Sequence, residues 1–332
     1  MLLRLNKEDN ISVLNGKDPS IDGILKKCLA GKDSGKITVC IATDYAAGNY
    51  GDLLARYIVE QLSGKAVVKY PENNIYHLDS VGSVLNRNEM CSNAVVWGSG
   101  FLSPQAYYKI KLTKFRQWIR RKTGRPLYLA VRGKLTREIL LKSGYQCPAV
   151  YADPALVMPQ IYYPKQTKKF ELGIVLHWSQ EKFIPLFENI PGVKIININR
   201  KYETLNTFVD EILQCKAVLS SSLHGLIIAN AYKIPCVRLK ILNNPIAASE
   251  HKDDFKFEDY LSGLNSCKCE KDKADYIFNT LFLKPGEEQC GILINQVQTK
   301  ATVPDFKIDL TPLIQAFPFL AERYKGRKFI ID

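Results

Sequence analysis

Residues 217–235 read AVLSSSLHGLIIANAYKIP, and this stretch predicts a strand, a polar turn and a helix. The first three residues are a short apolar run of the kind found in buried strands. The serines at 220–222 precede the helix, as capping residues do. The residues after them can continue as a packed helix until Pro235 ends it. A strand followed by a helix is the repeating unit of open α/β sheets.

This pattern places His224 in the first turn of the predicted helix. Free N–H groups and the positive end of the helix dipole attract anions there. A histidine with an ordinary pKa of about 6.5 could give or take a proton beside a bound phosphate or carboxylate. Alternatively, His224 only packs or caps, and the serines are ordinary N-caps. We favour an anion site, because hydroxyls, a histidine and a glycine share one strand-to-helix turn, where such sheets bind ligands.

The composition is that of a soluble globular protein. The chain has 332 residues, more than one compact core usually holds, so two domains are expected. With 46% hydrophobic and 24% charged residues and no apolar run of about eighteen, no membrane span is expected. The first residues, MLLRLNKED, lack the apolar core of a signal peptide. We expect a cytoplasmic protein whose nine scattered cysteines are reduced and mostly buried, with no metal site.

The net charge of +13 is concentrated in one segment. Residues 109–125 carry eight lysines and arginines and no acidic residue, with apolar residues at helical spacing. They predict an amphipathic helix with a basic face. We favour a helix that packs on a sheet and exposes its charges to water. The functional alternative is peripheral contact with anionic lipid or a lipid-pyrophosphate substrate. Nucleic acid is not an expected partner, because no binding module accompanies the charge.

Strands and small turn residues alternate through the first half of the chain. A buried strand at 36–43 leads into Asn49-Tyr-Gly-Asp52 and a helix, without a dinucleotide or P-loop fingerprint. The alternative for this turn is structural, with Asp52 as a helix cap. A second strand at 93–97 ends in Gly-Ser99-Gly, where small residues let a ligand or another backbone approach closely.

A third predicted strand, at 126–131, ends in Arg132 and a glycine. An arginine at a strand end can hold a carboxylate or phosphate through two parallel hydrogen bonds, which lysine cannot reproduce. The alternative for Arg132 is a surface salt bridge. Residues 148–156 are expected to close the first sheet, with Asp153 shaping the turn rather than acting in chemistry.

The second half of the chain again alternates strands and helices, so a second mainly parallel sheet is expected. A strand at 172–176 ends in His177, and further strands are predicted at 193–198 and 236–239 around the central strand-turn-helix. A helix is predicted at 204–214.

These motifs, in this order, resemble those of the polysaccharide pyruvyl transferases, particularly the branch that makes pyruvate ketals on exopolysaccharides and capsules. The resemblance spans roughly residues 36–320. It rests on SSLHGLI followed by A-x-x-x-x-I-P, on His177, on Asn-x-Gly-Asp at 49–52, on Arg-Gly-x-x-Thr at 132–136, on Asp-Pro-Ala at 153–155, and on Phe-Lys-Phe-x-Asp-Tyr at 255–260.

The resemblance implies an α/β fold of two Rossmann-like domains whose mainly parallel sheets face a cleft, as in the GT-B glycosyltransferases. The expected divisions are an N-terminal extension at 1–35, a first domain at 36–160, a linker at 161–170, a second domain at 171–305, and a C-terminal helix and tail at 306–332. The last segment could cross back onto the first domain.

The resemblance also implies an activity. Such enzymes transfer pyruvate from phosphoenolpyruvate, a co-substrate, to two hydroxyls of a sugar, forming a cyclic ketal and releasing phosphate; no cofactor is expected. The acceptor would be a saccharide of a bacterial-type surface polysaccharide or a lipid-pyrophosphate-linked oligosaccharide. The alternative enzyme is a GT-B glycosyltransferase with a nucleotide-sugar donor. The alternative without catalysis is a binder of polyanions or membrane surfaces, supported only by the charge.

From this chemistry we assign acid/base catalysis to His224 and an anion grip to Arg132. The residues assigned to the phosphate and carboxylate of phosphoenolpyruvate are Ser221, Ser222, Leu223 and Lys256. The residues assigned to the acceptor side are Asn49, Asp52, Ser99 and His177. Ser222 stands where other family members carry arginine, and Lys256, Arg238 or Lys240 is expected to supply the missing charge. The alternative for Lys256 is a solvated lysine between two buried rings.

Overall fold

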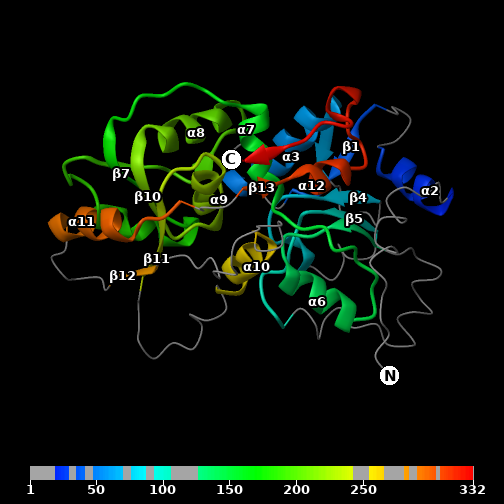
Figure 1. Ribbon diagram of the computed structural model, residues 1–332, viewed down its shortest axis with the longest axis horizontal. Coiled ribbons are helices and arrows are strands. Elements are labelled where there is room, and N and C mark those ends of the chain that lie inside the picture. Colours follow the sequence, from blue (N-terminus) through cyan, green and yellow to red (C-terminus); the bar gives the residue numbers. More distant parts are fainter. Residues whose placement is uncertain are drawn as a thin grey trace.

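Two parallel five-stranded sheets with helices around them form the framework of the protein (Figure 1). This confirms the expected α/β class. The computed structural model describes residues 19–29, 35–41, 48–69, 76–86, 93–105, 126–241, 254–264, 280–283, 290–303 and 307–331. The basic stretch at 109–125, for which a helix was expected, lies outside the described residues.

The first sheet has the strand order β3-β1-β4-β5-β6. Its strands are β1 (Ile37–Val39), β3 (Val67–Lys69), β4 (His77–Asp79), β5 (Ala94–Trp97) and β6 (Leu127–Ala130). The chain leaves β1 toward one edge, returns to β4 beside it, and then proceeds to the other edge. The topological switch point of this sheet therefore lies between β1 and β4.

The second sheet has the order β12-β11-β10-β7-β8. Its strands are β7 (Phe170–Val175), β8 (Val193–Ile195), β10 (Cys215–Ser220), β11 (Cys236–Ile241) and β12 (Thr280–Leu283). The predicted strand at 217–219 is the middle of β10, which pairs with β7 and β11 on its two sides. The switch point of this sheet lies between β7 and β10.

Helices connect and cover these strands. Those that the argument needs are α3 (Tyr50–Ser63), α6 (Lys134–Lys142), α8 (Leu205–Leu213), α9 (Leu223–Ala231) and α10 (Asp254–Leu264). The remaining helical segments are α2 (Pro19–Cys28), η1 (Val84–Asn86), η2 (Pro154–Val157), α7 (Met158–Ile161), η3 (Trp178–Leu186), η4 (Tyr202–Thr204), α11 (Cys290–Lys300), α12 (Thr311–Gln315) and η6 (Glu322–Tyr324). Every residue of α9 except His224 is buried, as expected for a helix that is apolar on all sides.

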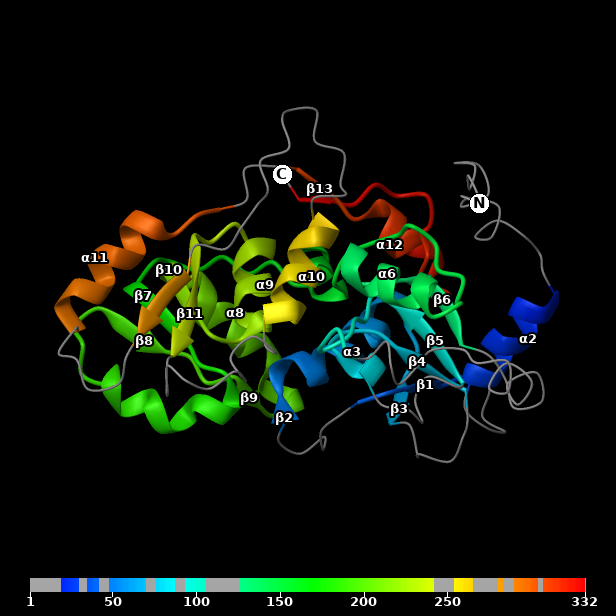
Figure 2. The ribbon, with the colours of Figure 1, turned by 90° about the horizontal axis from the view of Figure 1, so that it is seen from below.

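The two sheets share one hydrophobic core. A two-stranded antiparallel ladder joins the halves, with β2 (Gly48–Asn49) pairing with β9 (Asn199–Arg200). Figure 2 shows this ladder between the two sheets. Directly after it, the Tyr50 ring of α3 stacks on the Phe208 ring of α8 with 4.0 Å between centroids. The core therefore continues from the first half of the chain into the second.

The C-terminal residues lie over the first half of the molecule (Figure 1). The indole N–H of Trp97 donates a 2.7 Å hydrogen bond to the carbonyl of Leu313 in α12. The N–H of Ala321 donates to the carbonyl of Leu62 in α3. The short strand β13 (Ile308–Asp309) pairs with β14 (Ile330–Ile331). The terminal helix is shorter than the sequence predicts, because the chain turns at Ala316.

None of the helices in the described ranges is long and apolar enough to cross a bilayer. The cysteines described at 28, 40, 147, 215 and 236 are free thiols and buried. Burial raises the pKa of Cys236 to about 12, so this thiol stays protonated and behaves as a small apolar side chain.

The shared core makes a prediction about cooperativity. Replacing the fully buried Phe208 with alanine should lower the free energy of unfolding by about 3–5 kcal/mol, because the cavity lies where the two halves meet. Phe282→Ala, at a ring that is 59% exposed, should change it by no more than about 0.5 kcal/mol. Denaturant unfolding followed by circular dichroism measures both. Separate transitions for the two halves in wild type would contradict a shared core.

Candidate active site

The serine turn between β10 and α9 is held mainly by its own hydrogen bonds. The Ser220 hydroxyl accepts the N–H of Ser222 at 3.0 Å and lies 2.8 Å from the Ser222 carbonyl. Gly225 leaves the space for this hydroxyl, since a Cβ at that position would overlap it. The Ser221 hydroxyl accepts the N–H of His177 at 2.9 Å. This bond ties the carboxyl end of β7 to the turn that follows β10.

The start of α9 has unused hydrogen-bonding groups. Ser222 is the N-cap residue, but its side chain makes no capping bond. The N–H groups of Leu223, His224 and Gly225 have no acceptor within the described ranges. The serines that were predicted to cap α9 therefore do not cap it through a side chain. These three N–H groups are available to bind an anion.

His224 lies between the first turns of two helices. Its ring packs so closely on Gly51 that a Cβ at residue 51 would overlap the imidazole. Gly51 is the second residue of α3, whose N-terminus is capped by the Asn49 side chain accepting the Gly51 N–H at 3.0 Å. The first turns of α3 and α9 therefore meet at the imidazole. The alternative in which Asp52 caps this helix is wrong, because Asn49 is the N-cap residue of α3 and Asp52 lies in its first turn.

The two switch points contribute to the same place. His177 and the serine turn follow β7 and β10, and Asn49 and Asp52 lie between β1 and the body of α3. Asp52 Oδ1 is 3.9 Å from where a Cβ of Gly82 would lie, in the turn after β4. Open α/β sheets bind ligands at the carboxyl ends of the strands that flank a switch point. In this protein the strand ends at the switch points of both sheets lie near His224.

The charge state of His224 differs from the sequence expectation. Burial first, then the positive charges of Arg132 and Lys256, and last the nearby His177 lower the pKa of His224 to about 3 from 6.5. Its Nε2 is closed to solvent and has no hydrogen-bond partner among the residues that the structure describes. The imidazole is therefore neutral at pH 7 in the absence of a ligand, and it binds a proton only weakly until its surroundings change.

Among the cations considered as replacements for the family arginine, only Lys256 acts on His224. The Arg238 guanidinium and the Lys240 ammonium both pair with Asp254, at 2.5 and 2.8 Å. Lys256 is only 8% exposed, lies 5.4 Å from the Phe257 ring centre, and lowers the pKa of His224. The alternative of a solvated lysine is wrong.

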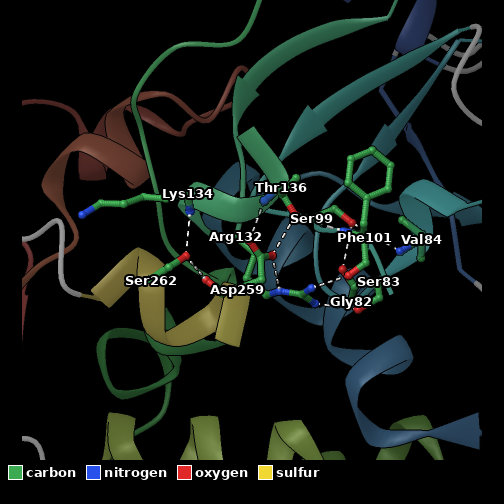
Figure 3. Close-up of polar contacts among 10 residues, drawn as sticks. All are labelled: Gly82, Ser83, Val84, Ser99, Phe101, Arg132, Lys134, Thr136, Asp259 and Ser262. Atoms are coloured by element: carbon green, nitrogen blue, oxygen red, sulfur yellow. Dashed lines mark hydrogen bonds and ion pairs between the residues drawn. The ribbon is translucent and has the colours of Figure 1, made fainter. Parts of the chain in front are cut away.

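Arg132 and Asp259 form a buried ion pair at the centre of a polar network (Figure 3). Arg132 Nε donates to Asp259 Oδ2 at 3.0 Å, and the terminal nitrogens donate to the Ser83 hydroxyl and the Phe101 carbonyl. The Asp259 carboxylate also accepts the N–H and the hydroxyl of Thr136, each at 2.7 Å. Both charged side chains are fully buried. Arg132, for which an anion grip was expected, donates three N–H groups within the protein. The salt bridge given as its alternative is present, but it is internal and does not lie at the surface.

Glycines let this network close. Cβ atoms at Gly100 and Gly133 would overlap the Arg132 and Asp259 side chains and the Asp259 backbone, and one at Gly263 would overlap the Arg132 carbonyl. Helix α10 therefore packs directly on the end of β6 and on α6, although it comes from the second half of the chain (Figures 1 and 2).

Two further residues named from the sequence have internal bonds. The fully buried Ser99 hydroxyl donates to the Gly82 carbonyl at 2.8 Å, so it supports the turn after β4 and is closed to solvent. Asp153 caps η2 by accepting the Ala155 N–H at 2.9 Å. Burial raises the pKa of Asp153 to about 6, against the hydrogen bond from Ala155 and the charge of Arg132. Asp153 shapes its turn, as the sequence indicated.

Sequence reasoning missed Gly51, Asp259 and Ser83. Gly51 stood within the quoted Asn-x-Gly-Asp motif, and Asp259 within Phe-Lys-Phe-x-Asp-Tyr, so both motifs carried a signal. Ser83 carried none, because its partner Arg132 lies 49 residues away. No group of three or more histidine, cysteine or acidic side chains that could hold a metal ion occurs in the described parts of the chain.

Comparison with known proteins agrees with this geometry. The family model described as polysaccharide pyruvyl transferase matches residues 48–242, which include Asn49, Arg132, His177 and His224. The chain belongs to this family. One similar relative is an uncharacterized protein of Acanthamoeba polyphaga mimivirus, 28% identical over 223 residues, or 64% of this chain and 70% of that protein.

A solved structure of an uncharacterized protein from Klebsiella pneumoniae subsp. pneumoniae NTUH-K2044 is also similar. It aligns with a TM-score of 0.42 and 10% identity, over 84% of this chain and 99% of the Klebsiella chain.

The buried ion pair predicts a large stability effect. Asp259→Asn should lower the free energy of unfolding by about 3–5 kcal/mol, because it leaves the Arg132 charge buried without its partner. Lys216→Gln, which breaks the exposed pair with Glu171, should change it by less than about 1 kcal/mol. Denaturant titration of both variants tests this, and equal small losses would show that Arg132 does not depend on Asp259.

The pKa of His224 predicts a pH-dependent stability difference. Because the folded pKa of about 3 lies below the unfolded value, the unfolded chain binds more protons between those values, and stability falls as the pH drops below 6.5. His224→Gln lacks this contribution. From pH 6 to pH 5, wild type should lose about 1 kcal/mol more unfolding free energy than the variant. Parallel losses in the two proteins would contradict a neutral, buried imidazole.

Proposed function

We propose that this protein transfers pyruvate from phosphoenolpyruvate to two hydroxyls of a sugar and forms a cyclic ketal. The observation that supports the proposal most is the neutral His224 in the first turn of α9, beside unbonded helix N–H groups and close to Lys256. Phosphoenolpyruvate carries a phosphate and a carboxylate, and this arrangement offers donors and positive charge for anions together with a proton acceptor.

The donor would bind at the N-terminus of α9. We assign its phosphate to the N–H groups of Leu223, His224 and Gly225, with the hydroxyls of Ser221 and Ser222 and the charge of Lys256. Lys256 takes the part of the arginine that other family members carry at the position of Ser222. Arg132 keeps its bonds to Asp259, so in this proposal it holds α10 and Lys256 in place rather than gripping the substrate.

The reaction requires proton transfers that suit His224. Protonation of the methylene carbon of phosphoenolpyruvate gives a methyl group and leaves the neighbouring carbon cationic. The first sugar hydroxyl adds to that carbon and loses its proton, and neutral Nε2 of His224 can accept it. Phosphate then leaves with the electron pair of its C–O bond, and the second hydroxyl adds and loses its proton. The proton added to the methylene carbon comes from solvent. Of the two hydroxyl protons, one returns to solvent in its place and the other leaves with phosphate, so the products are the ketal and hydrogen phosphate.

Anion binding would change the proton affinity of His224. The cations that lower its pKa are offset when a phosphate binds beside the imidazole, so binding should raise the pKa. A proton taken from the first hydroxyl would then be retained long enough to be given to a leaving group. Because Nε2 is closed to solvent, substrates reach it only after a local shift of neighbouring groups.

The acceptor side is assigned to Asn49, Asp52 and His177. His177 follows β7, on the other side of the second switch point from the serine turn, and Asn49 and Asp52 lie at the switch point of the first sheet. We further propose that the acceptor is a saccharide of an exopolysaccharide or capsule, or the lipid-pyrophosphate-linked precursor of such a polysaccharide. The reaction would take place in the cytoplasm. Peripheral membrane contact through residues 109–125 would bring the enzyme to such a precursor.

Ligand binding and turnover test the donor. At about one hundred times its dissociation constant, phosphoenolpyruvate should stabilise the protein by about 2.7 kcal/mol and raise the melting temperature by a few degrees. A panel of nucleotide-sugars should not. With a saccharide acceptor, His224→Gln should lower phosphate release by about 10²-fold or more.

Gly51→Ala should also lower phosphate release, because the added Cβ displaces the imidazole. Gly23→Ala is the matched control in α2, where a Cβ meets nothing within 4 Å, and it should leave turnover unchanged. Stabilisation by a nucleotide-sugar alone would contradict the proposal, as would full turnover by His224→Gln.

A further inference from the structure

Trp178 presents a large aromatic surface to solvent beside the candidate site. Its side chain is 57% exposed, whereas tryptophan is highly buried on average. It is the first residue of η3, and its ring centre lies 5.5 Å from that of His177. No residue of η3 is buried, so the hydrophobic core does not explain a tryptophan at this position.

The connection to the site runs through His177. The backbone N–H of His177 donates to Ser221 in the turn before α9, and His177 is among the groups that lower the pKa of His224. The His177 Nδ1 accepts the N–H of Ser179, which fixes the start of η3. Trp178 therefore directly follows a residue that is hydrogen-bonded to the turn before His224.

Polar groups lie on the same side of η3. Residues three apart on a 3-10 helix eclipse each other, so Glu181 lies on the face of Trp178. The Asn199 side-chain amide donates to Glu181 Oε1 at 2.5 Å. In the β2–β9 ladder, Asn199 is directly opposite Asn49. A flat apolar ring, a carboxylate and two amides thus lie on segments that adjoin the serine turn and the start of α3.

We infer that Trp178 is the stacking platform for a hexopyranose ring of the acceptor. Such a ring has C–H groups on one face, which pack on an aromatic surface, and hydroxyls around its edge, which Glu181 and Asn199 can bind. The inference rests on the proposed pyruvyl transfer, since stacking on Trp178 would direct two ring hydroxyls toward His224. The platform selects the acceptor and takes no part in donor binding.

Direct saccharide binding without phosphoenolpyruvate tests the platform separately from the transfer. The labelled full-length protein is applied to an array of glucose, galactose, mannose and N-acetylhexosamine glycosides and their oligosaccharides. Wild type should retain a subset of them. Trp178→Ala should lose about tenfold or more in apparent affinity, and Trp178→Phe, which keeps a flat ring, should stay within about threefold of wild type.

Tyr163→Ala is the matched control. This ring is 74% exposed and stacks on Tyr232, at the far end of α9 from His224, so its loss should leave saccharide binding unchanged. Each variant should keep the wild-type melting temperature and its shift with phosphoenolpyruvate. Absence of the phosphoenolpyruvate shift in wild type would show that the donor proposal has failed. If that shift is absent while saccharide binding depends on Trp178, the proposed pyruvyl transfer is wrong and the stacking platform is still supported.

Several results would overturn the platform. They are wild-type affinity in Trp178→Ala, an equal loss in Tyr163→Ala, and no saccharide retained by wild type. A loss of the phosphoenolpyruvate shift in Trp178→Ala alone would instead place this ring in the donor site. If Trp178→Ala changes only the oligomeric state measured by light scattering, the exposed ring is a protein contact.

Discussion

The buried ion pair between Arg132 and Asp259 is the interaction on which the site depends. It joins the end of β6 in the first sheet to α10, a helix that follows β11 of the second sheet. Burying two charges is costly, and a buried pair contributes to stability only when the remaining donors and acceptors are satisfied. Here Ser83, Phe101 and Thr136 satisfy most of them. The pair therefore fixes one arrangement of α10, and with it the position of Lys256.

The contact between His224 and Gly51 is the second constraint. Two helix N-termini carry partial positive charge, and bringing them together around one imidazole favours a bound anion over a bound proton. Only glycine leaves room for the ring in the first turn of α3. The Asn-x-Gly-Asp motif is thus explained by packing as much as by chemistry. Asparagine caps the helix, glycine accepts the imidazole, and Asp52 points toward the turn after β4.

The sequence predicted what local patterns encode. The strand-turn-helix at 217–235 appears as β10, the serine turn and α9, because an apolar run and a proline define its ends. Strand β4 was missed: its three residues include the buried His77 and Asp79, so neither an apolar run nor alternation marks it. The partners of Arg132 were missed because Asp259 lies 127 residues away and its bond depends on how α10 packs.

The electrostatics of His224 were also beyond the sequence. A first-turn histidine predicts proton exchange near neutrality, but the burial and the cations Arg132 and Lys256 that lower the pKa of His224 come from elements far apart in the chain. This difference also bears on Ser222. An arginine at that position would add a cation to a site that already lowers the pKa of its histidine. Lys256 supplies positive charge from α10 instead, and the position of α10 depends on the Arg132–Asp259 pair. In the proposed mechanism, a single helix would therefore couple anion binding and proton uptake by His224 to the packing of the two halves.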